Sequence, residues 1–203
     1  GVSLHDDGVA PDRIAGDGVY SGHFVPPTPG AFTLTFPGGD LVSLQVMSEY
    51  VAQTTAFAYR SIAGQNLELS DDGTAVVTSP FPIFFGGGSF QSLFVNSNGS
   101  VSFGGGHTAF NNVPLPSPAT NTLASPFWDD LRPFPGTGRN AFFEVIGTAP
   151  NRELVVEWRD VSHYICRNES SSTVTFQVVF FEGSAQILFN YLDVMSGGSC
   201  AFA

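Results

Sequence analysis

Lysine is absent from this chain. All 7 basic residues are arginines, and 18 carboxylates give a formal net charge of −11 at pH 7. A surface of this sign repels phosphate backbones and anionic lipid headgroups. The charge balance therefore excludes nucleic-acid binding and membrane-surface binding from the functions that we expect, and it makes divalent cations natural partners.

Long hydrophobic runs are absent as well. No apolar stretch approaches the ~20 residues that a membrane-spanning helix needs. The first residues also lack the basic and apolar regions of a signal peptide. We therefore expect no membrane insertion from this stretch of chain.

Local signatures of catalysis are missing. The sequence has no Gly-x-Ser-x-Gly turn, no His-x-x-x-His pair and no Cys-His cluster, and its 4 histidines are scattered. The Gly-Gly-Gly triplets at 86–88 and 104–106 suit hairpin connections better than phosphate-binding loops, because neither follows a strand and opens a helix. A Ser-His-Asp triad assembled from distant residues stays open, but no pattern favours one.

Two pairs of carboxylates could be read as catalytic, but the geometry expected of a strand argues against both. Asp129 and Asp130 fall in a strand expected at 124–130, where adjacent side chains point to opposite faces. Glu153 and Glu157 share a strand face, but the usual strand rise separates them by about 13 Å. Glycosidase carboxylates are only roughly 5 to 9.5 Å apart. We therefore predict that the chain is not an enzyme.

Residues typical of strands and turns are abundant. The chain contains 20 Phe, 23 Gly and 14 Pro, only 12% of its residues are charged, and no stretch shows a sustained helical period. We predict an all-β protein with an antiparallel β-sandwich over residues 61–203. Its strands are expected near 66–69, 74–78, 91–96, 100–103, 124–130, 141–146, 153–160, 173–182 and 185–192.

The pair Asn98-Gly99 is the most specific local feature. Two alternating apolar runs meet there, and Asn-Gly supplies the two residues with positive φ that a type I′ turn requires. The sequence therefore predicts a β-hairpin with a tight two-residue turn.

Residues 1–47 are predicted to form a smaller β unit, followed by a connector at 48–60. Three or four strands cannot close a good sandwich alone, so we expect an incomplete, immunoglobulin-like unit. The last residues, from Gly197 to Ala203, look like the start of a strand that is cut off. We expect the chain to be a fragment of something larger or a subunit completed by its neighbours. The strands of the smaller unit are expected near 2–5, 19–25, 32–36 and 41–47.

A series of pieces in the second unit resembles the nidogen-type extracellular domain. The resemblance implies an extracellular β-sandwich of the kind found in matrix, adhesion and secreted surface proteins, and it carries over no catalytic residue. The pieces, in order, are Phe81-Pro82-Ile83-Phe84-Phe85-Gly86, Val95-Asn96-Ser97-Asn98-Gly99, Ser125-Pro126-Phe127-Trp128-Asp129-Asp130, Val155-Val156-Glu157-Trp158, Thr175-Phe176-Gln177-Val178-Val179 and Ile187-Leu188-Phe189-Asn190-Tyr191.

The first unit is similar to the closing strands of immunoglobulin-like modules in secreted bacterial surface proteins. The similarity rests on Asp6-Asp7-Gly8, Asp12 and Gly16-Asp17-Gly18-Val19-Tyr20. It implies a small β unit that belongs to a longer secreted chain.

The loop from Asp6 to Asp17 is the candidate metal site. It carries the carboxylates of Asp6, Asp7, Asp12 and Asp17, opposed only by Arg13. Ca²⁺ takes six to eight oxygen ligands, and backbone carbonyls at the glycines can complete such a shell. EF-hand spacing is absent, and the alternative is a solvated turn in which Asp and Gly serve the backbone. We predict that calcium is the cofactor of this loop.

The two cysteines are expected to form a disulfide. Strands 153–160 and 185–192 run in the same direction in the predicted meander, and Cys166 and Cys200 lie a few residues beyond their ends. A bridge across this loop length is worth on the order of 3 to 4 kcal/mol. It implies an oxidising, extracellular or periplasmic setting, and two separate thiols are the alternative.

Two N-glycosylation sequons begin at Asn98 and Asn168. Such triplets occur often by chance, and the first also serves the predicted hairpin turn. They matter if the source glycosylates its secreted proteins.

These features predict a non-catalytic structural or adhesive module of a secreted or cell-surface protein. Its expected partners are other protein chains, including copies of itself joined into an extracellular fibre by strand exchange. The alternative is a carbohydrate- or ligand-binding accessory domain of a secreted hydrolase, with glycans as partners. Aromatic residues exposed on one sheet face would favour that alternative.

Overall fold

The computed structural model describes residues 2–22, 24, 30–46, 50–115 and 122–197. Contacts divide the chain into two compact units, residues 1–52 and 53–203, and each is described by itself. The sheets are antiparallel, and the described residues contain no α-helix, only a 3₁₀ turn, η1, at Tyr164–Cys166. The prediction of an all-β protein is confirmed. None of the described segments is a helix long and apolar enough to cross a membrane.

The first unit contains one two-stranded antiparallel sheet. Strand β1 (Gly30–Thr35) pairs with β2 (Leu41–Val46), as the alternation of the sequence predicted. The strands expected near 2–5 and 19–25 do not form in the described residues, where a single bridge joins His5 to Ser21. At the start of the second expected strand, the N–H of Val19 donates to Oδ1 of Asp17 at 2.9 Å and is therefore not available to a ladder. The immunoglobulin-like character of this unit stays a prediction.

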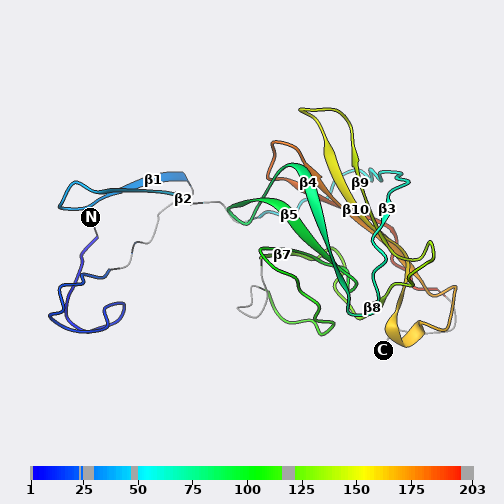
Figure 1. Cartoon of the computed structure of the whole chain (residues 1–203), viewed down its shortest axis with the longest axis horizontal. Helices are drawn as coiled ribbons and strands as arrows, with labels where there is room; N and C mark the ends of the chain where they lie inside the picture. Colours follow the sequence, from blue (N-terminus) through cyan, green and yellow to red (C-terminus); the bar gives the residue numbers. More distant parts are fainter. Residues whose placement is uncertain (1, 23, 25–29, 47–49, 116–121, 198–203) are drawn as a thin grey trace. The chain divides into compact units, whose positions relative to one another are not determined.

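The second unit contains two sheets (Figure 1). One has the strand order β4-β5-β6-β7, and the other has the order β12-β11-β10-β9-β3, with β8 also paired to β10. Register is antiparallel throughout. The bounds are β3 (Gln65–Asn66), β4 (Thr74–Phe85), β5 (Gly88–Asn96), β6 (Val101–Phe103), β7 (Thr122–Ala124), β8 (Leu131–Arg132), β9 (Ala141–Ile146), β10 (Glu153–His163), β11 (Val174–Phe181) and β12 (Ile187–Asp193).

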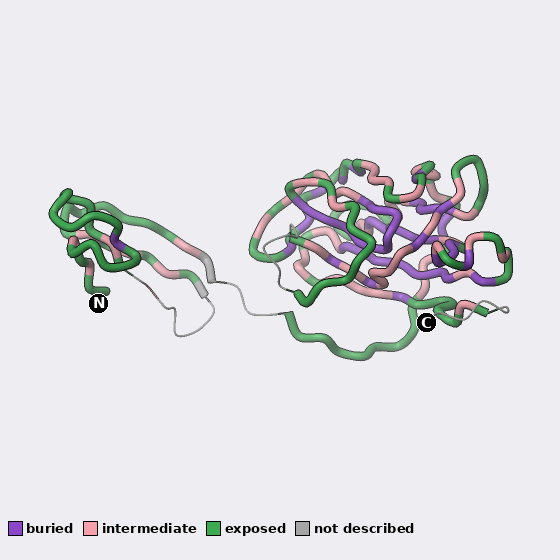
Figure 2. The backbone as a smooth tube through the Cα atoms, turned by 90° about the horizontal axis from the view of Figure 1, so that it is seen from below, coloured by how far each residue is buried: buried purple, intermediate pink, exposed green. Residues whose placement is uncertain are grey.

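The main core lies between the two sheets, and Figure 2 shows the buried residues of this unit in purple. Fully buried side chains of β4 and β5, such as Val77 and Leu93, belong to the same cluster as those of β10 and β11. Trp158 stacks on Phe176 with ring centroids 5.0 Å apart, and its Nε1 donates to the carbonyl of Asn96 at 2.8 Å. The predicted β-sandwich is confirmed.

The segment that contains Pro80 and Pro82 belongs to strand β4. Strand β4 continues through Pro80 and Pro82 to Phe85, with a bulge between Thr78 and Ile83. Proline cannot donate to a ladder, but β4 is the edge of its sheet, where a missing N–H costs no pairing bond. The strand expected at 74–78 is therefore correct in position and too short.

The strand expected at 124–130 is wrong. Strand β7 ends at Ala124, and the chain then runs irregularly until β8 begins at Leu131. This segment wraps the tip of the β5–β6 hairpin, where the N–H of Phe127 donates to Gly99 and that of Asp129 donates to Asn98. Asp129 and Asp130 are therefore not strand residues, and the argument that they face opposite sides does not apply.

The hairpin between β5 and β6 is confirmed, but its turn differs from the prediction. The N–H of Asn96 donates to the carbonyl of Ser100 at 3.0 Å, and Gly99 has a φ of 77° while Asn98 is not in the positive-φ region. The turn is thus longer than a two-residue type I′ turn. It is also buried, because Asn96, Asn98 and Ser100 each have 0% of their surface exposed.

Candidate functional site

Three carboxylates of the acidic loop converge in the first unit. One ligand oxygen from each of Asp6, Asp12 and Asp17 lies within 4.8 Å of the other two. Two backbone hydrogen bonds of 2.9 Å between His5 and Ser21 close the base of the loop. Across the described ranges, no other group of three or more Asp, Glu, His or Cys residues meets at this spacing.

Asp6 is held by backbone from the opposite side of the loop. Its Oδ1 accepts hydrogen bonds from Gly16 and Asp17 at 2.6 and 3.2 Å, and its Oδ2 accepts one from Gly18 at 3.0 Å. Gly16 and Gly18 have φ values of 73° and 83°, which glycine adopts without strain. The sequence Gly-Asp-Gly therefore turns successive N–H groups toward one carboxylate.

Asp12 is the most buried of the three, with 4% of its surface exposed. Its Oδ2 accepts a hydrogen bond from the backbone N–H of Gly8 at 2.6 Å, and its Oδ1 accepts one from the backbone N–H of Arg13 at 2.8 Å. The Gly8 bond is the largest cause that lowers the pKa of Asp12 below its ordinary value, against the opposing effect of burial. This carboxylate is therefore charged at neutral pH.

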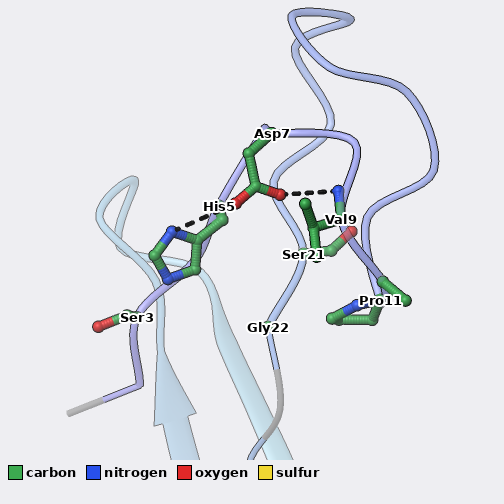
Figure 3. Close-up of a pocket in the computed structure, with 8 residues that line it drawn as sticks. Ser3, His5, Asp7, Val9, Pro11, Ser21 and Gly22 are labelled. Carbon is green, nitrogen blue, oxygen red and sulfur yellow. Dashed lines mark hydrogen bonds and ion pairs between the residues drawn. The ribbon is translucent and has the colours of Figure 1, made fainter.

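Asp7, the fourth predicted ligand, lies apart from the cluster. Its Oδ1 accepts a hydrogen bond from the N–H of Val9 at 2.9 Å, and its Oδ2 lies 4.0 Å from Nδ1 of His5. Figure 3 shows this pair beside a pocket of about 390 Å³ that Ser3 and Ser21 also line. The structure thus brings together three of the four predicted ligands and leaves Asp7 out.

The cluster concentrates negative charge without a basic partner. Among the described residues, no arginine or histidine forms an ion pair with Asp6, Asp12 or Asp17. Backbone N–H groups offset part of the repulsion, as they would in a turn that needs no ion. Carboxylate oxygens gathered at this spacing also suit a hard cation such as Ca²⁺, which prefers oxygen ligands.

Carboxylates of the second unit gather around the buried hairpin turn but do not converge on one point. Nε2 of His163 lies 3.3 Å from Oδ1 of Asp129, and Nδ2 of Asn98 donates to Oδ1 of Asp72 at 2.9 Å. Burial is the largest cause that raises the pKa values of Asp71 and Asp130 above their ordinary value. We assign these groups to the structure of the turn.

The predicted glycosylation residues differ in access. Asn98 is fully buried, and its Nδ2 donates to Asp72 and to the carbonyl of Thr108 at 3.2 Å. A glycan on this nitrogen would leave one N–H for two acceptors, and the side chain is fully buried, so the sequon at Asn98 does not fit the folded domain. Asn168 lies exposed in the turn that follows η1, where a glycan fits.

The predicted disulfide can be placed at one end. Cys166 is buried at the end of η1, with 2% of its surface exposed. Cys200 lies outside the described residues, so its pairing with Cys166 stays a prediction.

The part of the chain that matches a known family is the second unit. A family model described as NIDO related matches residues 49–201. No curated protein matches the chain, and no solved structure matches it. The matched range contains both sheets of the sandwich and leaves out the acidic loop, so the candidate metal site lies outside the region that the family model covers.

Proposed function

The chain belongs to the NIDO-related family, whose domains are typically extracellular, and from this membership we propose that it is a non-catalytic adhesive module of a secreted or cell-surface protein. Its partners are other protein chains, including further copies of itself. The observation that carries this proposal is the apolar face of the β1–β2 hairpin, which Phe24 covers at Phe32 and which stays exposed at Val42.

One face of the hairpin is apolar, whereas the other carries polar side chains together with Leu41, which pairs with Thr35. Its register pairs Phe32 with Leu44 and Leu34 with Val42 on one face, while Thr33 pairs with Ser43 on the other. Val42 remains 47% exposed although it lies on the apolar face. A two-stranded hairpin with one apolar face is marginal in water unless further strands or a facing layer cover it.

Strand addition would supply that cover. Neither outer edge of the β1–β2 sheet has a strand partner within the described residues. An extended segment from another chain can pair with such an edge through main-chain hydrogen bonds, and its side chains then extend the apolar face. Repeated between copies in one direction, this contact produces a fibre.

Sedimentation velocity of the full chain over a wide range of concentrations tests self-assembly. We expect reversible oligomers that Val42→Asp abolishes, because a carboxylate on the apolar face opposes the contact. Thr33→Asp places the same charge on the polar face and serves as the matched control. Monomers at every concentration would overturn self-assembly.

We also propose that Asp6, Asp12 and Asp17 bind Ca²⁺, which would fix the conformation of the acidic loop within the first unit. The support is the convergence of three carboxylates that lack a basic partner. Isothermal titration with Ca²⁺ should show binding that Asp12→Asn removes and that Asp40→Asn, outside the cluster, leaves intact. The absence of binding heat, together with an unchanged melting temperature after chelation, would refute the calcium proposal alone.

A glycan-binding role is the second candidate. It is favoured by Phe57 and Tyr59, whose rings stack with centroids 6.0 Å apart and an interplanar angle of 23°. Phe57 is 62% exposed, as expected of a ring that could contact a sugar. A glycan-array signal that Phe57→Ala removes would support this role, and an array without signal would count against it.

A further inference from the structure

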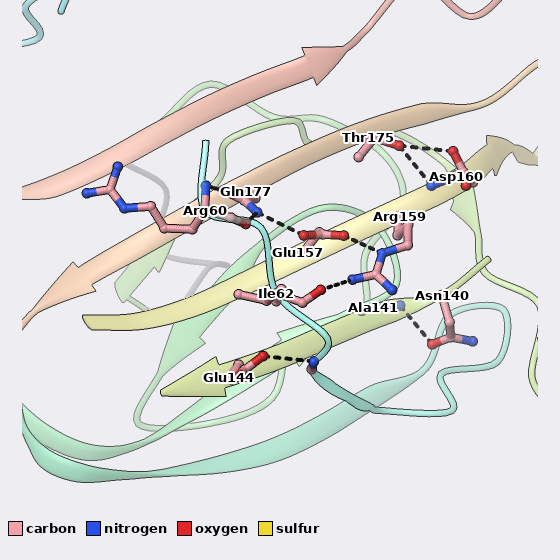
Figure 4. Close-up of polar contacts among 11 residues, drawn as sticks. Arg60, Ile62, Asn140, Ala141, Glu144, Glu157, Arg159, Asp160, Thr175 and Gln177 are labelled. Atoms are coloured by element: carbon pink, nitrogen blue, oxygen red, sulfur yellow. Dashed lines mark hydrogen bonds and ion pairs between the residues drawn. The ribbon is translucent and has the colours of Figure 1, made fainter. Parts of the chain in front are cut away.

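Residues 58–64, which we name the strap, cross the outer face of the larger sheet. Figure 4 shows that the strap passes over β11, β10 and β9, held by side chains of those strands. Residues 58–60 fall in the expected connector, and the partners that hold them lie far away in the chain. Gln177, for example, is 117 residues from Arg60.

Side-chain amides hold the first part of the strap. Oε1 of Gln177 accepts the N–H of Arg60 at 3.1 Å, and its Nε2 donates to the carbonyl of Arg60 at 2.6 Å. Nδ2 of Asn190, on β12, donates to the carbonyl of Ala58 at 2.9 Å. The buried Gln177 therefore pairs with the strap backbone as a neighbouring strand would.

Charged side chains hold the rest of the strap. The guanidinium of Arg60 donates twice to the carboxylate of Glu153, at 2.7 and 2.9 Å. Further along, Arg159 donates to the carbonyl of Ile62 at 2.9 Å, and the N–H of Gly64 donates to Glu144 at 2.9 Å. Each of these contacts reaches the strap from a strand by a single side chain.

The apolar contact under the strap is separate from the main core. Ile62 packs in a small cluster with Phe142, Val155 and Val179, none of which belongs to the cluster between the sheets. Removing the strap would expose this small cluster and leave the packing between the sheets in place. The strap therefore meets the conditions for a segment that opens before the rest of the domain.

We propose that the strap is a force-released segment. Tension that reaches the domain along the backbone from the N-terminal side loads Ala58 first, then Arg60, then Ile62, because these contacts follow one another along the chain. They break one at a time, whereas the ladder between β10 and β11 shares its load over many bonds. The strap thus lengthens the link to the first unit while the sandwich stays folded. This proposal concerns the second unit alone and does not depend on the adhesive or calcium proposals.

Single-molecule force spectroscopy tests the proposal on the full chain. Handles are attached through bioorthogonal residues placed at Val51, in the exposed segment before the strap, and at Thr148, in the exposed turn between β9 and β10. We expect a first extension of at most about 25 Å as residues 58–64 are released. Unravelling of the whole chain between the handles would extend it by roughly 330 Å.

Arg60→Ala should shorten the lifetime of the strap at constant force by about tenfold or more, because hydrogen bonds to charged groups are the stronger ones. Arg152→Ala is the matched control. Arg152 forms a similar ion pair, with 2.5 Å between its Nη2 and Oε1 of Glu182, and this pair does not involve the strap. This variant should leave the first extension unchanged. Asn190→Ala, a milder change, should shorten the lifetime less than Arg60→Ala.

Two results would overturn the proposal. One is a single large extension in the unaltered protein, with no small step before it. The other is a small step whose lifetime Arg60→Ala and Asn190→Ala leave unchanged.

Discussion

The two units hold their backbones in place by different means. In the second unit, side chains of two sheets pack into a core that contains fully buried residues such as Trp158 and Leu154. In the first unit, no hydrophobic side chain among the described residues is buried, and the buried residue is the charged Asp12. We infer that packing determines the stability of the second unit, whereas hydrogen bonds from the backbone to carboxylates contribute more to that of the first.

The largest loss of stability is expected from Gly99→Ala, which places a side chain at the tightest backbone contact of the second unit. A Cβ on Gly99 would lie 1.8 Å from the carbonyl oxygen of Phe127, and its φ of 77° disfavours other residues. We expect failure to fold or a loss of more than about 4 kcal/mol of unfolding free energy, measured by urea denaturation.

Gly104→Ala is the matched control for that clash. Gly104 has a φ of 80°, but a Cβ there would meet nothing within 4 Å. Backbone strain alone should cost about 1 kcal/mol. Equal losses for the two variants would show that the close approach of Phe127 is not what requires glycine at position 99.

A pair of leucines compares the units directly. Leu154 is 0% exposed in β10, whereas Leu41 is 65% exposed in β2. Leu154→Ala should cost about 2 to 5 kcal/mol, and Leu41→Ala should change stability by less than about 0.5 kcal/mol. Thermal unfolding followed by calorimetry measures both. A large loss for Leu41→Ala would contradict this difference between the units.

Acid should act in opposite directions on the two units. The folded pKa of Asp12 is lowered from 3.8, so its contribution to stability is present above 3.8 and is lost as pH falls through the lower folded pKa. The folded pKa values of Asp71 and Asp130 are raised from 3.8, so their protonation relieves a cost as pH falls toward 3.8.

Hydrogen exchange of individual amides at several pH values measures this difference. Protection of Gly8 should fall below pH 3.8, while protection of Leu131, beside the buried turn, should rise as pH falls toward 3.8. Asp12→Asn should remove the first change and leave the second. Parallel changes in both units would contradict the assignment of the two carboxylate environments.

The smallest effect is expected at the exposed sequon. In a host that glycosylates secreted proteins, the intact mass should reveal a glycan at Asn168 and none at Asn98, because only Asn168 is exposed. Asn168→Gln should remove the glycan and change unfolding free energy by less than about 0.5 kcal/mol. A glycan at Asn98 in folded protein would show that the hairpin turn opens.

Features with local causes could be predicted from the sequence. The alternation of Phe32 to Phe36 gave β1, the runs that flank Asn98 gave the β5–β6 hairpin, and the density of Asp and Gly gave the acidic loop. Asp7 was included among the ligands because sequence proximity cannot tell which carboxylates point to the same place. Its side chain instead accepts the N–H of Val9, two residues away.

Features with distant causes could not be predicted. The type of the hairpin turn depends on the segment after Ala124, which fills the space beside Gly99 and pairs with Asn98. The strap is bound to the sheet through hydrogen bonds of Arg60 with Glu153 and Gln177, and no local pattern of residues predicts these contacts.

The sequence by itself determined the all-β class, the division into a small unit with an acidic loop and a larger β-sandwich, and the nidogen-type resemblance that the family match then bore out. These follow from alternation, turn chemistry and composition, which act between near neighbours. Only the tertiary structure decided which carboxylates meet, which asparagine is accessible and which segment the sheet binds from outside. Those outcomes depend on burial and on side-chain partners from distant strands, which only the packing of the whole unit brings together.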